Sequence, residues 1–228
     1  MPSEKRTPDM GDGGSATLLR NNMFATLAGM LANLSDEVLM LRYCEGDLPA
    51  FQELYARHSH GLYRFLAWRS PRSEWVDEIA QDSWISLHRT RARYQPQASF
   101  RTYLYQIARN RLIDLLRQPQ ALLATDLGVG DEGEALFDHL ADAAHYHASP
   151  EAELESRQLS ADLHAAIRAL PGEQKEALIL QQFNGMSLEE IAQLVAVPVE
   201  TVKSRLRYAM RKLRQHFSEG LAPQEEPA

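Results

Sequence analysis

Apolar residues along most of this chain recur every three or four positions, which is the spacing of one buried face of an α-helix. From residue 35 onward this spacing predicts a helix that starts at Ser35, a long helix over 51–66 that Ser70-Pro71 breaks, and helices near 76–87 and 100–117. It predicts a second set over residues 151–170, 173–183 and 188–195, and a last helix after Pro198. No segment alternates apolar and polar residues in the manner of a strand. The sequence therefore predicts an all-α fold.

The helical pattern lapses between residues 119 and 154, a stretch that contains Gly128, Gly130 and Pro150. We expect this stretch to be a flexible linker between two small helical domains, at residues 35–118 and 155–216. Residues 1–34 form an extension that we expect to be partly disordered, and residues 217–228 a polar tail. Residues 18–34 are more apolar and could form an amphipathic helix that packs on the first domain or binds a partner.

The second domain ends in the outline of a helix-turn-helix. Ser187 and Glu190 stand at the spacing of a capping box, and Pro198 cannot continue a helix, so the break is expected there. The following helix has an apolar stripe of Val202, Leu206, Ala209, Met210 and Leu213. Its other side is basic, because residues 201–216 hold six Lys or Arg and no Asp or Glu. Such a helix suits the major groove of DNA.

Charged residues are distributed unevenly along the chain, with basic and acidic segments next to each other. The chain of 228 residues carries a formal charge of -7, yet residues 89–117 hold seven Arg and one acidic residue. Residues 118–154, by comparison, hold eight Asp or Glu and no Lys or Arg, so the predicted linker is acidic.

The single Cys44 excludes an internal disulfide, and no stretch of 18 apolar residues predicts a membrane span. We expect a cytoplasmic protein without a metal site, cofactor or small-molecule substrate.

The first domain carries a second nucleic-acid signal, in which aromatic residues alternate with Arg. Single-stranded nucleic acid is held by stacking on aromatic rings and by cationic contacts to phosphate. Phe100 and Leu104 belong to the core, and Tyr103 fits a core or a surface position equally well. Tyr105, Arg109 and Asn110 are harder to explain as core residues. Further candidates are Tyr94, Arg101 and Arg111.

Two ordered motif sets carry a family resemblance. The first domain reads D-E-I-A-Q-D and then F-R-T-Y-L-Y-Q-I-A-R-N, and the second reads A-L-P-G-E-Q-K-E-A-L and S-L-E-E-I-A-Q-L-V-A-V-P-V-E-T-V-K-S-R-L. Together they resemble a bacterial RNA polymerase sigma factor of the sigma-70 family, in the extracytoplasmic-function group. The resemblance implies a transcription initiation factor, not an enzyme, that gives core polymerase its promoter specificity.

The resemblance also implies roles for individual residues. Residues 94–99 would form a pocket for a base flipped out of the -10 element, and the helix after them would hold the neighbouring unpaired strand. The implied -10 contacts are Gln95, Gln97, Ser99, Arg101, Tyr103, Tyr105, Arg109 and Asn110. The implied -35 contacts are Lys203, Ser204, Arg205, Arg207, Tyr208 and Arg211. Binding to core polymerase would use Asp77, Glu78, Gln81 and Asp82.

Implied partners are the clamp helices and flap of core polymerase, duplex and single-stranded promoter DNA, and an anti-sigma protein, which is often membrane-anchored. Tyr208 stands where the family often has Arg, so the -35 sequence is expected to differ. The acidic linker suggests a mimic of nascent RNA near the polymerase active site.

The alternative is a stand-alone helix-turn-helix regulator, which would leave the aromatic and Arg run unexplained. No phosphate loop or nucleophile-base pair indicates catalysis.

Overall fold

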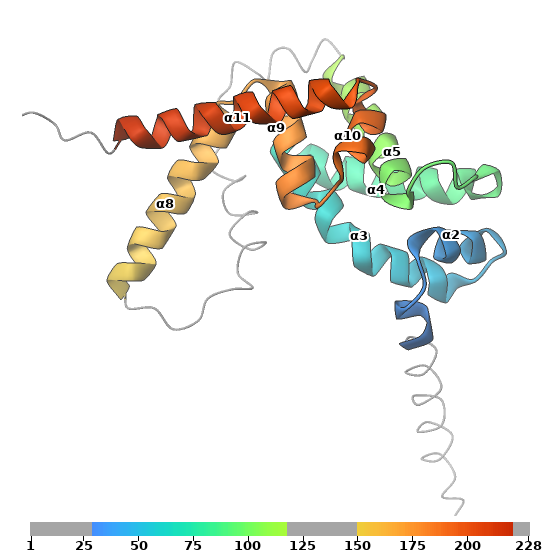
Figure 1. Cartoon of the computed structure of the whole chain (residues 1–228). Helices are drawn as coiled ribbons and strands as arrows, with labels where there is room; N and C mark the ends of the chain where they lie inside the picture. The colour runs from blue at the N-terminus through green and yellow to red at the C-terminus, as the bar shows by residue number, and fades with distance from the viewer. Residues whose placement is uncertain (1–28, 118–149, 221–228) are drawn as a thin grey trace, which may run out of the picture. The chain divides into compact units, whose positions relative to one another are not determined.

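The structure, a computed structural model, describes residues 29–117 and 150–220, and all regular elements in these ranges are helices (Figure 1). This confirms the all-α prediction. Contacts divide the chain into two compact units, residues 1–55 and 56–228. Predictions for residues 1–28, for the linker up to residue 149 and for the tail beyond residue 220 lie outside the described residues. Within the described ranges, no helix is long and apolar enough to cross a membrane.

The first unit contains α2 (Asp36–Cys44) and the start of α3 (Leu48–Arg69). The Ser35 hydroxyl accepts a hydrogen bond from the Val38 amide, which confirms the helix start expected at this serine. Gly46 has a φ of +101°, a conformation that suits a residue without a Cβ, and so the chain can turn between the two helices. Beside this turn, Arg42 Nε lies 2.8 Å from Asp47 Oδ2.

The middle helices, as we call residues 56–117, comprise the rest of α3 with α4 (Glu74–Thr90), the 3₁₀ turn η1 (Arg91–Arg93) and α5 (Phe100–Leu116). α4 packs along α5 (Figure 1). The Ser99 hydroxyl caps α5 by accepting from the Thr102 amide. The core of these helices includes Leu62, Phe65, Leu66, Ile79, Ala80, Leu87, Phe100, Leu104, Ala108 and Leu112.

The C-terminal helices, residues 150–220, comprise α8 (Pro150–Arg168), α9 (Gly172–Leu178), η3 (Ile179–Phe183), α10 (Leu188–Val195) and α11 (Val199–Gly220). The sequence predicted one helix over 173–183, but its last five residues form a π-helix. The Asn184 amide accordingly donates to the Ile179 carbonyl, five residues earlier, at 3.2 Å. The chain therefore leaves η3 with Asn184 and Gly185 at its end.

α10 and α11 form the predicted helix-turn-helix. Both bonds of the capping box are present, from the Glu190 amide to the Ser187 hydroxyl and from the Ser187 amide to the Glu190 carboxylate. The turn begins two residues before Pro198, because Ala196 ends α10 in the left-handed conformation with φ of 55°. Four residues of the expected α11 stripe are buried, whereas Met210 is 39% exposed. That part of the prediction was wrong.

Candidate nucleic-acid interface

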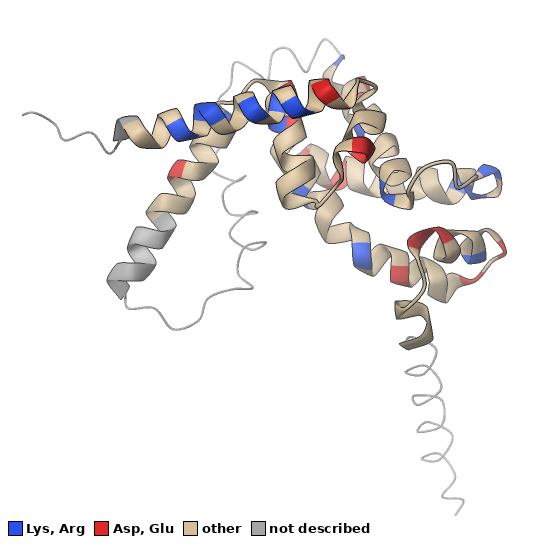
Figure 2. Cartoon of the chain, in the orientation of Figure 1, with Lys and Arg blue, Asp and Glu red and all other residues tan. Residues whose placement is uncertain are grey.

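α11 has one buried face and one basic face, as the sequence predicted. Val202, Leu206, Ala209 and Leu213 are buried. Lys and Arg side chains recur along the helix (Figure 2), and the exposed ones include Lys203, Arg207, Arg211, Lys212 and Arg214. Because the apolar face anchors the helix to its neighbours, the basic face remains available to a negatively charged ligand such as DNA.

The other predicted -35 residues on α11 lie in three settings. Lys203 Nζ donates to Glu200 Oε1 at 2.7 Å, and this hydrogen bond raises the pKa of Lys203, so the amine is charged. The Ser204 hydroxyl donates to the Thr201 carbonyl at 2.8 Å and is half-buried. The Tyr208 ring is exposed between two guanidinium groups, with Arg207 at 5.5 Å and Arg211 at 5.1 Å from its centroid.

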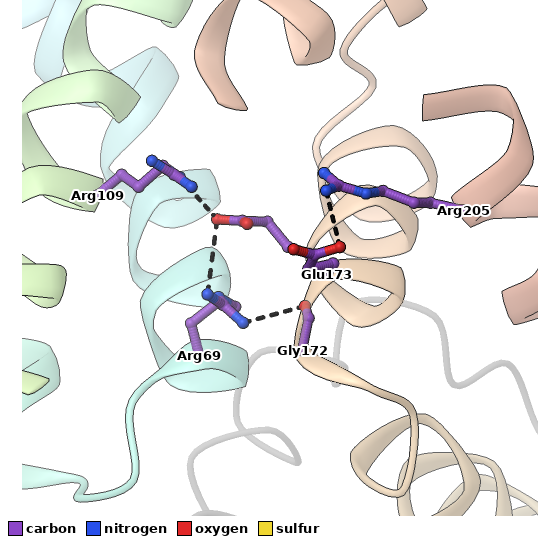
Figure 3. Close-up of polar contacts among 6 residues, drawn as sticks. Arg69, Arg109, Gly172, Glu173 and Arg205 are labelled. Atoms are coloured by element: carbon purple, nitrogen blue, oxygen red, sulfur yellow. Dashed lines mark hydrogen bonds and ion pairs between the residues drawn. The ribbon is translucent and has the colours of Figure 1, made fainter. Parts of the chain in front are cut away.

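Arg205 occupies a different position from the exposed basic residues. Its Nη2 lies 2.7 Å from Glu173 Oε2 on α9, and its side chain is 17% exposed (Figure 3). The pair therefore ties α11 to α9. Arg205 acts here as a residue that positions α11, and sequence reasoning missed this role because Glu173 lies 32 residues earlier.

The predicted base pocket at residues 94–99 has two exposed amides. Gln97 Nε2 donates to Gln95 Oε1 at 2.9 Å. The Gln97 backbone amide also donates to the Gln95 backbone carbonyl at 2.8 Å. These bonds hold the two side chains together on the surface of the loop. The third predicted residue, Ser99, is engaged differently, because its hydroxyl caps α5 and donates to Glu190 Oε1 at 2.5 Å.

The two predicted stacking tyrosines of α5 differ in exposure. Tyr103 is half-buried, its ring 5.2 Å from that of Tyr94, and its hydroxyl lies 2.8 Å from the Thr90 hydroxyl. Tyr105 is 2% exposed and packs 5.3 Å from Phe65, so the expectation that it is hard to place in the core was wrong. Burial raises the pKa of Tyr105, which keeps its hydroxyl protonated.

Arg101 and Arg109 bind acceptors on the C-terminal helices. Arg101 Nη1 donates to the carbonyls of Asn184 and Gly185, each at 3.1 Å. Arg109 Nε lies 3.0 Å from Glu176 Oε1, and Arg69 Nη2 lies 3.7 Å from the same oxygen (Figure 3). Sequence reasoning missed Glu176, which is 4% exposed. The sequence feature that could have indicated its burial is its position directly before the apolar run Ala177–Leu180.

Asn110 lies on the exposed side of α5, beside a groove of about 540 Å³ between α4 and α5. Asp82, Arg111 and Asp114 also line the groove. Arg111 links its two walls, because it pairs with Asp82 at 2.8 Å and with Glu78 at 3.0 Å. Of the residues predicted to bind polymerase, Asp77 and Gln81 are therefore the exposed ones outside this network.

The chain matches known proteins over both sets of helices. Residues 54–121 match the family model of sigma-70 region 2, and residues 160–213 match that of sigma-70 region 4. The ECF RNA polymerase sigma-E factor of Haemophilus influenzae is 31% identical over 183 residues, which cover 78% of this chain and 92% of that protein. The RNA polymerase sigma-H factor of Pseudomonas aeruginosa is 30% identical, covering 78% and 91%.

Two solved structures share the fold. CnrH, in complex with the cytosolic domain of CnrY, superposes with a TM-score of 0.57 at 21% identity, covering 82% of this chain and 99% of that one. The sigma factor RpoE of Bartonella quintana, in complex with the anti-sigma factor NepR, has a TM-score of 0.52 at 20% identity, covering 74% and 96%. From the two family models and the curated relatives, the chain belongs to the extracytoplasmic-function group of the sigma-70 family of RNA polymerase sigma factors.

Proposed function

We propose that this factor recognises promoters through two surfaces, the basic face of α11 for duplex -35 DNA and the middle helices for the melted -10 strand. The observation that carries the proposal is the division of α11 into a buried apolar face and an exposed basic face, directly after a capped helix and a tight turn. We assign the two surfaces to domains at residues 35–118 and 155–216, joined by the linker at 119–154.

At the -35 element, α11 enters the major groove with its N-terminal half. Lys203 and Ser204 lie nearest that end and are the candidates for base contacts, which discriminate between bases by about 1–3 kcal/mol each. Arg207 and Arg211 are placed to bind phosphates on either side of Tyr208. The Tyr208 ring can pack against a thymine methyl group, a contact that an arginine at this position would not provide.

At the -10 element, Gln95 and Gln97 offer amides to the edges of a flipped base, and Asn110 offers one to its neighbour. Extruding a base costs a few kcal/mol of stacking, which such contacts must recover. Tyr103 provides the accessible ring, while Arg101 and Arg109 provide charge for the backbone. Tyr105 supports this surface from the core, and Ser99 fixes the start of α5 beneath it.

We assign binding of the polymerase clamp helices to α4, through Asp77, Glu78, Gln81 and Asp82. The flap of polymerase is the expected partner of the C-terminal helices. Because two structural relatives were solved with the CnrY cytosolic domain and with the anti-sigma factor NepR, we also infer control of this chain by an anti-sigma protein. The proposed role is non-catalytic and belongs to the cytoplasm, where polymerase and promoter DNA are found.

The decisive experiment mixes the purified chain with bacterial core RNA polymerase and follows co-elution on size exclusion at moderate salt. We expect a stable complex that supports run-off transcription from a subset of promoters. Duplex DNA binding by the chain alone, without any association with polymerase, would instead support a stand-alone regulator. An Arg207→Ala variant that kept polymerase binding but lost transcription would place the defect in promoter recognition.

A further inference from the structure

The last residue of α4 and the first turn of α5 are joined by a hydrogen bond between two side-chain hydroxyls. Thr90 Oγ1 lies 2.8 Å from the Tyr103 hydroxyl oxygen, 13 residues further along the chain. The chain between them contains η1 and the loop at 94–99. The bond therefore closes the base of the loop that carries Gln95 and Gln97, the two amides that we assign to the flipped base.

The other hydrogen bond of Thr90 fixes the direction of this one. A threonine hydroxyl has one proton to donate and two lone pairs with which to accept. Thr90 donates that proton to the Ser86 carbonyl, one turn earlier in α4, at 2.8 Å. Thr90 can then only accept from Tyr103, so the phenolic proton of Tyr103 is directed at Thr90. Toward any further ligand, the Tyr103 hydroxyl is an acceptor and not a donor.

Tyr94 holds the same ring from another side. The two tyrosine rings lie 5.2 Å apart with their planes at 60°. Tyr94 is buried, whereas Tyr103 is half-buried. A tyrosine side chain has two rotatable torsions, and a ligand that stacks on a mobile ring must immobilise them at a cost in entropy. With its hydroxyl bonded and one side packed, Tyr103 presents its exposed part in one orientation before any strand binds.

The surroundings of the ring favour an anionic ligand. Residues 83–113 contain no Asp or Glu, and Arg89 and Arg93, on either side of Thr90, are exposed. A single strand is held by stacking of its bases on aromatic rings and by cationic contacts to its phosphates. Because the Tyr103 hydroxyl is an acceptor, it can bind an N–H group on a base edge but cannot donate to a base carbonyl or ring nitrogen.

We propose that Thr90 is a positioning residue of the strand-binding surface, which fixes the Tyr103 ring and makes its hydroxyl an acceptor for one unpaired base. The proposal rests on the proposed function, since it takes Tyr103 as the stacking ring, and it adds a residue outside the set that the sequence predicted. Thr90 itself does not touch the strand. Its effect on DNA passes through Tyr103 alone.

Three substitutions isolate the bond. Thr90→Val keeps the shape of the side chain and removes its hydroxyl, whereas Thr90→Ser keeps the hydroxyl. Tyr103→Phe keeps the ring and removes the phenolic partner. Combining Thr90→Val with Tyr103→Phe completes a double-mutant cycle. A residue that acts only through the phenol has no further effect once the phenol is gone.

The sample is the full chain in complex with bacterial core polymerase, and the probe is a random library of short single DNA strands. Sequencing the bound strands gives the base preference at each position, and anisotropy of a fluorescein-labelled selected strand gives the affinity. We expect Thr90→Val to weaken strand binding about three- to tenfold, the value of one hydrogen bond, and to relax the base preference at a single position. Thr90→Ser should restore both properties, and Thr90→Val should add nothing in the Tyr103→Phe background.

The role of Thr90 is overturned if Thr90→Val binds the selected strand as the unsubstituted chain does, or if its effect persists in the Tyr103→Phe background. It is overturned equally if the preference relaxes at every position, because a general loosening of the loop would then explain the loss. If Thr90→Val loses its helical circular dichroism, Tyr103→Phe alone must relax the single position, and an unchanged selection overturns the role.

Failure of the proposed function is seen separately, through Tyr103→Ala. Strand binding that is unchanged by this variant would remove the ring from the strand-binding surface and would overturn the role of Thr90 with it. The absence of any complex with core polymerase, in every variant and in the unsubstituted chain, would have the same consequence. Strand binding that is lost in Tyr103→Ala but kept in Thr90→Val overturns the role of Thr90 alone.

Discussion

Arg111 Nε lies 2.8 Å from Asp82 Oδ2, so an arginine of α5 holds a carboxylate that we assign to polymerase binding. The same guanidinium reaches Glu78 on the previous turn of α4 at 3.0 Å. Asp82 and Glu78 therefore join α4 to α5 in addition to any contact with a partner. The exposed Asp77 and Gln81 are the residues of the set with which polymerase binding can be tested most cleanly.

We predict that Asp77→Ala weakens the complex with core polymerase and leaves the free energy of unfolding within about 0.5 kcal/mol of the unsubstituted chain, as for most surface changes. Asp82→Ala should cost about 0.5–1 kcal/mol of stability, because it removes one of the two carboxylates that pair with Arg111 at a partly exposed site. Urea unfolding and titration with labelled polymerase measure the two effects. Polymerase binding that is unchanged by Asp77→Ala would remove α4's exposed face from the proposed interface.

Neighbouring arginines of α11 should respond differently to removal. Arg207→Ala should weaken duplex DNA binding at all sequences and reduce the salt dependence by about one phosphate contact, with stability unchanged. Arg205→Ala should lower the midpoint of urea unfolding, since it breaks the pair with Glu173. Binding isotherms at several salt concentrations, together with urea titrations, distinguish them. If Arg205→Ala altered only DNA binding, its assignment as a positioning residue would be wrong.

Local features of this fold, such as helix starts and ends, could be predicted from the sequence. The helix start at Ser35 and the cap at Ser187 were predicted because each depends on residues within three or four positions, and both serines cap their helices. The end of α3 before Pro71 follows in the same way from the missing amide of proline. Such signals act before any tertiary contact forms.

Features that depend on residues distant in the chain could not be predicted from the sequence. Tyr105 is buried because α3 supplies Phe65 against it, and Met210 is exposed although its spacing matches the α11 stripe. The partners of Arg109 and Arg205 lie 67 and 32 residues away, so their charges were read as free for DNA. Periodicity identifies a helix face, but it does not say which edge of that face a neighbouring helix covers.

Two residues of the α11 stripe test the difference between apolar spacing along a helix and actual burial by a neighbouring helix. Leu213 is 8% exposed and Met210 is 39% exposed, although the sequence placed both in the core. We predict that Leu213→Ala costs about 2–3 kcal/mol of unfolding free energy, because it leaves a cavity beneath α11. Met210→Ala should cost less than about 1 kcal/mol. Urea unfolding of the two variants compares them, and equal losses would show that Met210 is buried in solution.

A last prediction concerns pH and the capping box of α10. Burial alone would raise the pKa of Glu190, but hydrogen bonds from Ser99 and from the Ser187 amide, together with the charge of Arg101, outweigh it and lower that pKa. A lowered pKa means that the folded chain binds the proton less tightly than the unfolded one. Its contribution to stability is therefore full above the usual glutamate pKa of about 4.3 and is lost as the pH falls through the lowered value.

Glu190→Gln should accordingly be less stable than the unsubstituted chain between about pH 5 and 7, and the gap should close as the pH falls below about 4. The exposed neighbour Glu189 provides the control, since Glu189→Gln should stay near the unsubstituted chain throughout. Urea midpoints measured across this pH range give the comparison. A gap that persisted undiminished at the acid end would mean that the side chain acts through its shape, because protonation of the carboxylate would then have removed nothing.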